Sequence, residues 1–214
     1  NTPSWPLHEE SMREAVRNGT PRSSLQMNCS GKHSGMVVTC AMNGWDLPGY
    51  LDPHHPLQEL ITETVHDACG EPASSIGTDG CGAPAHVISL VGLARAFRNM
   101  ATGALGDAGL QIHHAMSRHS HMVGGTGRHV TEICSAVPGL MAKDGAESVY
   151  AAALPDGRAV ALKISDGSSR GQATVLLAAL KKLGVDVSAV PDSVAEIAYG
   201  HGKPVGRVRA LGFD

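Results

Sequence analysis

Residues 148–164, SVYAAALPDGRAVALKI, decide the fold. Two runs rich in Ala, Val, Leu and Ile flank the turn sequence Pro155-Asp156-Gly157, a pattern that is typical of a β-hairpin. Asp166-Gly167 ends the second run, and a helix is predicted over about 169–183. The sequence therefore places an antiparallel hairpin, followed by a long helix, in the last third of the chain.

Helical periodicity dominates the chain before this hairpin. The spacing of apolar residues predicts helices over about 8–17, 33–43, 52–68, 87–100 and 108–119, and a last strand over about 198–208. The segment 33–43 is apolar nearly all round, so we expect it to be a buried helix. Helices first and an antiparallel hairpin later favour an α+β fold over alternating βαβ units, and we expect a single domain over residues 1–214.

Composition excludes several classes of partner. The chain has 214 residues, enough for one good core, and a formal net charge of -3 gives no reason to expect nucleic acid or an anionic membrane as partner. No segment approaches the roughly 20 apolar residues that a membrane helix needs. The five cysteines are odd in number and irregularly spaced, which favours a reducing, cytoplasmic compartment over a disulfide framework.

Two glycine-rich segments carry reactive side chains, NCSGKHSG over 28–35 and DGCGAP over 79–84. Cys29 and Lys32 stand three apart at a predicted helix entrance, so their side chains can converge, and Cys81 could supply another ligand. Thiolates favour zinc, although a lysine amine binds metal only when it is neutral. The alternative is that both cysteines are small buried residues.

A lysine and an arginine form a second set of candidates. In MAKDGAE, residues 141–147, Lys143 leads into a strand, loosely as in the Lys-Thr-Gly strand of serine β-lactamases, or it is simply solvated. In MVGGTGR, residues 122–128, the glycines could hold Arg128 toward a substrate carboxylate. Phosphate binding is excluded there, because no Gly-Lys-Ser/Thr follows.

The remaining histidines and cysteines are expected to be structural. Four histidines are expected at a polar, exposed helix end, where they lack converging cysteines or carboxylates. Three cysteines are expected to pack in the core. These residues are His113, His114, His119 and His121, and Cys40, Cys69 and Cys134.

Seven motifs in one order give a specific resemblance. They are residues 5–10, 28–36, 52–58, 79–84, 125–128, 143–147 and 161–167. This order resembles that of the class 3 bacterial L-asparaginases of the asparaginase II family, and it covers almost the whole chain.

The resemblance implies an amidohydrolase that converts L-asparagine to L-aspartate and ammonia. Its implied fold is similar to that of serine β-lactamases and glutaminases, with an antiparallel sheet and helices, and its implied assembly is a homodimer. The resemblance also assigns roles to residues. Cys29, Lys32 and Cys81 look like the zinc ligands, with water completing the sphere; His33, Asp79 and Lys143 look catalytic; Arg128 and Gly82 look substrate-binding.

One assignment stays open, and the chain departs from the family in two places. Lys163 is a rival to Lys143 as the site lysine, and Asp144 stands where the better-known strand motif has a hydroxyl residue. The family's Ser-x-x-Lys nucleophile is also missing, since none of the six lysines has a serine three residues before it. We therefore expect an N-terminally truncated chain, lacking the first part of the fold, that is nearly inactive on its own.

Two other functions stay open. Zinc could activate its own water, with Asp79 or His33 as the base, in an amidohydrolase that needs no missing segment. The chain could also be a non-catalytic remnant that binds zinc and an amino acid.

Overall fold

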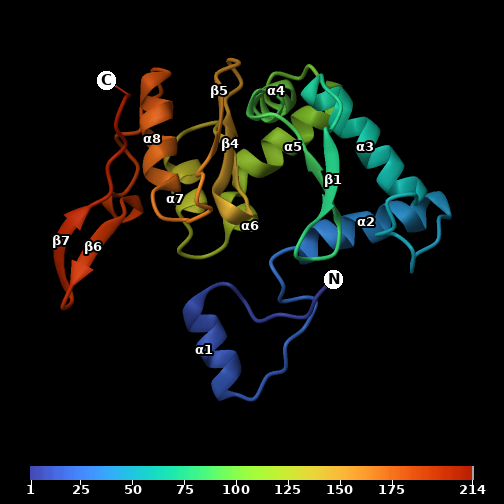
Figure 1. Cartoon of the computed structure of the whole chain (residues 1–214), viewed down its shortest axis with the longest axis horizontal. Helices are drawn as coiled ribbons and strands as arrows, with labels where there is room; N and C mark the ends of the chain where they lie inside the picture. Colours follow the sequence, from blue (N-terminus) through green and yellow to red (C-terminus); the bar gives the residue numbers. More distant parts are fainter. Residues whose placement is uncertain (214) are drawn as a thin grey trace. The chain divides into compact units, whose positions relative to one another are not determined.

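The computed structural model describes residues 1–213. They form two compact units, which we call unit 1 (residues 1–67 and 71–88) and unit 2 (residues 68–70 and 89–213) (Figure 1). The prediction of one asparaginase-like domain stays a prediction. Within the described residues, no helix combines the length and the apolar character that crossing a membrane requires.

Unit 1 contains three helices and one hairpin. Its elements are α1 (Glu9–Arg17), α2 (Ser30–Asn43), all but the last two residues of α3 (Pro56–Cys69), β1 (Ser75–Thr78) and β2 (Pro84–Val87). The two strands pair antiparallel, from Ser75 opposite Val87 to Thr78 opposite Pro84. The sequence predicted only a rigid turn near residue 80, because four-residue strands are too short to show an alternating pattern.

The burial predicted for α2 is wrong. Only His33 and Cys40 are buried in this helix, while Val38 is 56% and Met42 is 82% exposed. The helix begins at Ser30, three residues earlier than predicted, and ends where Gly44 adopts a left-handed conformation with φ 68°. An apolar composition therefore did not determine burial.

Unit 2 contains the sheet on which the main core is built. Its elements are α4 (Leu90–Ala101), α5 (Gly106–Arg118), α6 (Ser120–Gly124), α7 (His129–Ala136), β3 (Met141–Asp144), the 3-10 turn η1 (Ala146–Ser148), β4 (Val149–Ala153), β5 (Ala159–Lys163), α8 (Gln172–Lys182), the 3-10 turn η2 (Asp192–Val194), β6 (Ile197–Gly200) and β7 (Lys203–Arg207).

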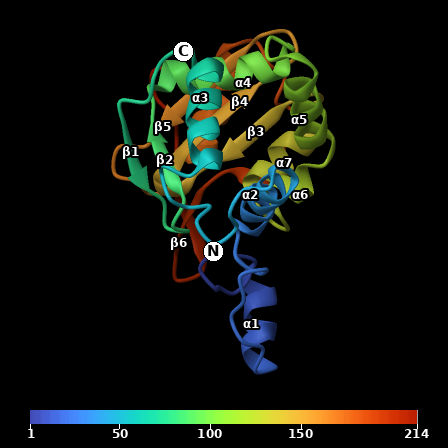
Figure 2. The same ribbon diagram turned by 90° about the vertical axis from the view of Figure 1, so that its right-hand side faces the viewer.

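The predicted hairpin is confirmed as β4 and β5, and β3 joins it on the other side to give the antiparallel order β3-β4-β5. Helices α4 and α5 cover one face of this sheet, and α7 and α8 cover the other (Figures 1 and 2). Side chains alternate between the faces. Ala142, Tyr150 and Ala152 belong to the core with α7 and α8, whereas Met141 and Ala153 pack against α4 and α5.

Two further expectations in unit 2 are wrong. The single strand expected over 198–208 is a hairpin, since His201-Gly202 form a turn between β6 and β7. His113, expected at an exposed helix end, is buried, and its Nε2 donates to the Gly139 carbonyl at 2.9 Å. Helices together with small antiparallel sheets nevertheless agree with the predicted α+β class.

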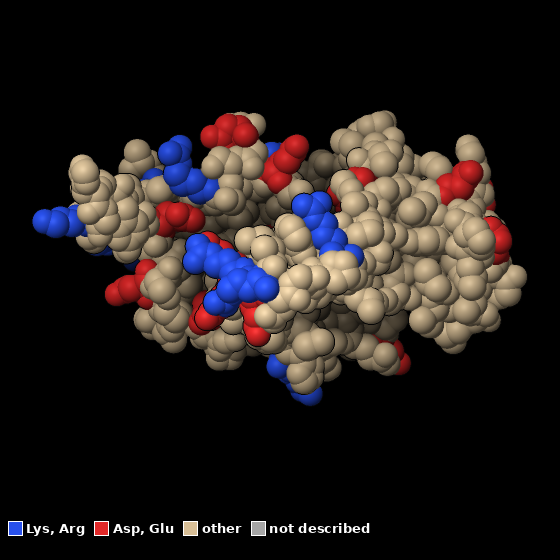
Figure 3. All heavy atoms as spheres, turned by 90° about the horizontal axis from the view of Figure 1, so that it is seen from below, with Lys and Arg blue, Asp and Glu red and all other residues tan. Residues whose placement is uncertain are grey.

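Charged side chains are mixed on the surface. On the face drawn in Figure 3, basic and acidic side chains lie close to one another instead of forming one large patch of either sign. This distribution agrees with the small net charge of -3.

Candidate functional site

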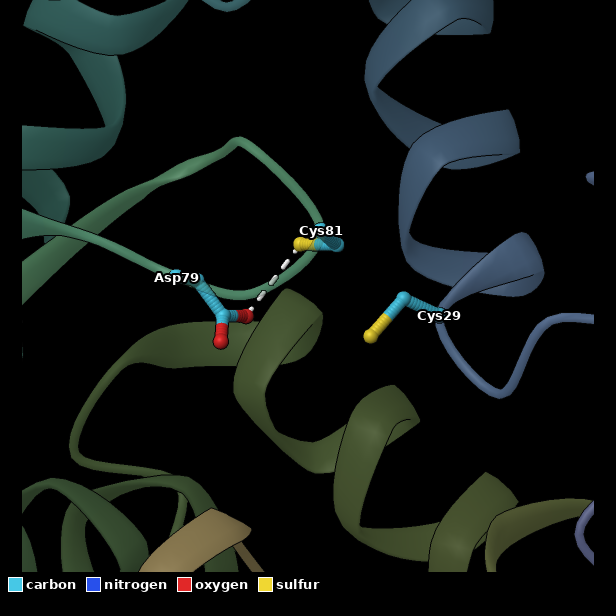
Figure 4. A group of neighbouring side chains, drawn as sticks. All are labelled: Cys29, Asp79 and Cys81. Atoms are coloured by element: carbon cyan, nitrogen blue, oxygen red, sulfur yellow. Dashed lines mark hydrogen bonds between the residues drawn. The ribbon is translucent and has the colours of Figure 1, made fainter. Parts of the chain in front are cut away.

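The first cluster lies in unit 1, where α2 begins opposite the turn between β1 and β2. Cys29 is the residue before α2, and Asp79 and Cys81 lie in the turn (Figure 4). The Sγ atoms of the two cysteines and a carboxylate oxygen of Asp79 lie within 4.8 Å of one another. The two cysteine motifs, separated by some fifty residues, therefore meet in space.

Backbone hydrogen bonds shape the turn that carries Asp79 and Cys81. The Asp79 amide donates to the Ala83 carbonyl at 2.8 Å, and the Gly82 amide donates to the Asp79 carbonyl at 2.8 Å. Gly82 has φ 87°, a conformation that disfavours any side chain. This gives Gly82 a structural reason to be glycine, while its predicted contact with substrate stays a prediction.

Lys32 joins the cluster from the first turn of α2. Its Nζ donates to Asp79 Oδ2 at 3.0 Å, and the Cys81 thiol donates to the same oxygen at 3.2 Å. These two hydrogen bonds hold the pKa of Asp79 below its usual range. Burial disfavours the Lys32 ammonium, but its hydrogen bonds to Asp79 and Cys81, together with the charges of Cys29 and Cys81, outweigh burial and raise its pKa.

The Cys29 thiol is held in its neutral form by its surroundings. Burial raises its pKa, the nearby Lys32 charge opposes that effect, and Cys81 and Asp79 raise the pKa further. Two sulfurs and a carboxylate oxygen form a donor set suited to zinc, and the Lys32 amine is a fourth nearby donor once it loses its proton. The chemistry of the residues present therefore fits a zinc site.

His33 lies next to Lys32 and is buried, with 4% of its surface exposed. Its Nδ1 is 2.7 Å from the Tyr50 hydroxyl, whereas its Nε2 is buried without a hydrogen-bond partner. Burial lowers the pKa of His33, and the positive charges of the N-terminus and Lys32 lower it further. The imidazole is therefore neutral and has one unused nitrogen.

The second cluster lies in unit 2 and is organised by one carboxylate. Asp144, at the end of β3, is only 6% exposed. One of its oxygens accepts a hydrogen bond from Arg128, which precedes α7, and the other accepts from Lys143 Nζ at 2.9 Å. Burial opposes the Asp144 charge, but the Lys143 hydrogen bond and the Lys143, Arg128 and His129 charges outweigh it, so the pKa of this carboxyl is lowered. The Asp144 carboxylate thus forms ion pairs with both Arg128 and Lys143.

A polar chain beside this carboxylate was missed in the sequence. His129 contacts the Tyr150 hydroxyl through Nδ1 at 3.2 Å and the Gln172 side-chain amide through Nε2 at 3.0 Å. Tyr150 and Gln172 are buried in the core around the sheet. The scarcity of aromatic residues could have drawn attention to Tyr150, one of only three tyrosines, but nothing in the spacing links it to His129.

The predicted site residues thus fall into two groups. Unit 1 contains Cys29, Lys32, His33, Asp79, Cys81 and Gly82, and unit 2 contains Arg128 and Lys143. The rival lysine, Lys163, lies on β5, which is separated from β3 by β4. Its Nζ donates to the backbone carbonyls of Glu147 and Ile164, so it takes no part in the Asp144 cluster.

Comparison with known proteins identifies the family at sequence level. No curated protein sequence matches this chain. The sequence model of the family described as L-asparaginase II matches residues 1–210, which include both clusters. The chain therefore belongs to the L-asparaginase II family.

Proposed function

We propose that this chain is part of a zinc-binding L-asparaginase of class 3, with a fold of the serine β-lactamase and glutaminase type. Membership in the L-asparaginase II family supports an amidohydrolase that acts on a small amide. The observation that carries the zinc assignment is the convergence of Cys29 and Cys81 beside Asp79. The homodimer and the cytoplasmic location rest on the resemblance and composition alone and stay predictions.

The proposed metal ligands are Cys29, Lys32 and Cys81. When bound, zinc supplies a positive charge that positions the substrate and polarises its surroundings. Binding requires that Lys32 release the proton that Asp79 stabilises, so Asp79 is the competing third ligand. His33 would support this region from its place next to Lys32, where its Nδ1 contacts the Tyr50 hydroxyl.

The second cluster is assigned to the substrate carboxylate. Arg128 and Lys143 supply two cations against the single Asp144 carboxylate, which leaves an excess positive charge for an anion. Both cations are partly exposed, at 36% and 47% of their side-chain surface, so a ligand can reach them. Lys143 is the lysine that would act with a serine.

The proposed nucleophile is a serine of a Ser-x-x-Lys pair that residues 1–214 do not contain. Its hydroxyl would attack the side-chain amide, ammonia would leave, and water would release L-aspartate from the acyl-enzyme. The deciding assay is ammonia release from L-asparagine by the purified, zinc-loaded chain. We expect none; clear turnover would contradict the missing nucleophile and favour the zinc-activated water.

Metal binding is tested separately. Replacing Cys81 with Ser should weaken zinc binding at least tenfold, measured against a competing chelator, because a thiolate ligand is lost. Cys40→Ser is the matched control, since Cys40 is buried in α2 and lies outside the ligand group. Equal zinc loss in both variants would contradict the ligand assignment. The zinc affinities of Lys32→Met and Asp79→Asn then identify the third ligand. We expect the larger loss of affinity in Lys32→Met.

Substrate binding is tested with L-aspartate. Arg128→Gln should weaken its binding by roughly 10- to 100-fold, the value of a hydrogen bond between charged groups. Arg158→Gln is the control, because Arg158 pairs with the exposed Asp156. Failure of the unsubstituted zinc-loaded chain to bind L-aspartate, or equal loss in the two variants, would contradict the role of Arg128.

A further inference from the structure

The backbone is strained directly after Lys143 and Asp144. Glu147 has φ 53° and ψ 32°, and Ser148 has φ 59°, so two adjacent residues with side chains adopt the left-handed conformation. Residues other than glycine avoid this region, and they keep it only where the surroundings hold them there. Strain of this kind gathers at functional sites, which raises the question of what holds this turn and why.

The side chain of Lys163 reaches the strained turn from β5. Its Nζ donates to the Glu147 carbonyl at 2.5 Å and to the Ile164 carbonyl at 2.8 Å. The Ile164 amide in turn donates to the Ser148 carbonyl at 3.1 Å. The ammonium therefore ties the left-handed residues to the end of β5, although the side chain is exposed to water.

The turn is connected to the second cluster through the sheet. The Gly145 amide donates to the Val149 carbonyl at 2.7 Å, and Asp144 is paired with Tyr150 across β3 and β4. A change in the turn would therefore move the end of β3. That end carries the Asp144 carboxylate, to which Lys143 and Arg128 donate.

We infer that Lys163 is a positioning residue whose ammonium holds the turn at Gly145–Ser148 in its left-handed form and thereby fixes Lys143 and Asp144. The role at the substrate carboxylate rests on the proposed function, whereas the role in the turn does not. This inference separates the two rival lysines: the Lys143 ammonium contacts the cluster, and the Lys163 ammonium contacts backbone carbonyls.

The test replaces Lys163 with Met, which keeps most of the stem and removes the donor. We expect the backbone amide NMR signals of residues 144–148 to shift and L-aspartate to bind about tenfold more weakly. Lys163→Arg, which keeps a cationic donor, should retain most of the binding. Lys181→Met on α8 is the matched control for loss of an exposed ammonium and should change neither readout.

A second substitution distinguishes positioning from direct contact with the ligand. Glycine adopts positive φ without the cost that a side chain brings, so Glu147→Gly should restore most of the L-aspartate binding lost in Lys163→Met. On its own, Glu147→Gly should change that binding less than twofold. If Glu147→Gly restores nothing, Lys163 acts on the ligand directly and the inference is overturned.

The amide signals keep this test independent of the proposed function. Unshifted signals at residues 144–148 in Lys163→Met would overturn the inference whatever the binding result. If the unsubstituted chain itself does not bind L-aspartate, the proposed function fails. Shifted signals in Lys163→Met that return in the double variant would still support the role of Lys163 in the turn.

Discussion

The two units hold their reactive side chains in different ways. In unit 1, Cys29, Asp79 and Cys81 stand on a helix entrance and a turn, and both core clusters of the described chain lie elsewhere. In unit 2, Asp144 lies at the end of β3, a strand of the sheet on which both core clusters are built. Hydrogen bonds of the turn and of Asp79 therefore hold the first cluster, whereas packing around the sheet fixes the second. Trp5 and Trp45 both belong to unit 1, so tryptophan fluorescence follows that unit alone.

The largest expected difference between the units concerns zinc. A free zinc concentration 100 times the dissociation constant should stabilise the bound unit by about 2.7 kcal/mol. We expect the urea midpoint followed by tryptophan fluorescence to rise, and amide exchange at residues 79–83 to slow. Amide exchange in β4 and β5 should not change. An equal response in both units would remove the distinction between them.

The next effect concerns the buried carboxylate. Asp144→Asn leaves Arg128 and Lys143 without their anion and should destabilise unit 2 by about 2 kcal/mol, below the value for a fully buried pair because both cations are partly exposed. Asp156→Asn, in an exposed pair with Arg158, should change the stability of unit 2 much less, because water screens the pair. Amide exchange in β4 and β5 measures both. If Asp144→Asn lowered the stability measured by tryptophan fluorescence as much as the stability measured by amide exchange, the two units would unfold together.

Acidification should destabilise unit 2 in two steps. Burial lowers the pKa of His129, so its contribution to stability is complete above the ordinary histidine pKa of about 6.5 and is lost as the pH falls from there toward the lowered value. The pKa of Asp144 is also lowered, so its contribution is lost as the pH falls from about 4 toward its folded value. Amide exchange of β4 and β5 measured against pH checks both steps, and His129→Gln should remove the first. Greater stability of unit 2 at pH 5 than at pH 7 would contradict this.

The smallest effects come from a matched pair of tyrosines, because each unit has one tyrosine hydroxyl bonded to a histidine. Tyr50→Phe and Tyr150→Phe should each cost about 1 kcal/mol, with the larger loss at Tyr50, whose hydrogen bond is 2.7 Å against 3.2 Å. Tryptophan fluorescence should report the first and amide exchange in β4 the second. If fluorescence responded to Tyr150→Phe and amide exchange in β4 responded to Tyr50→Phe, the two measurements would not separate the units.

Structure was predicted correctly from the sequence where turn residues or reactive side chains stand in a recognisable local pattern. The β4–β5 hairpin was predicted because Pro155-Asp156-Gly157 separates two apolar runs, and the meeting of Cys29 with Cys81 was predicted because the thiols stand in glycine-rich turns. Such signals are local, so they can be read along the chain.

Tertiary contacts explain the failures. The exposure of Val38 and Met42 depends on what packs against α2, and the link from His129 to Gln172 joins residues 43 apart in sequence. The ion pairing of Asp144 was also hidden, because its place in the motif suggested only a missing hydroxyl, whereas its burial between two cations is a property of the folded sheet.

The cysteines differ in their access to solvent, which has a practical consequence. Cys40, Cys69, Cys81 and Cys134 are buried, and only Cys29 is partly exposed, at the entrance of a helix. A maleimide dye should therefore label the native chain first at Cys29, and bound metal should slow that labelling. The chain thus offers a single attachment point for a fluorophore, and the speed of conjugation would report how much of a preparation is loaded.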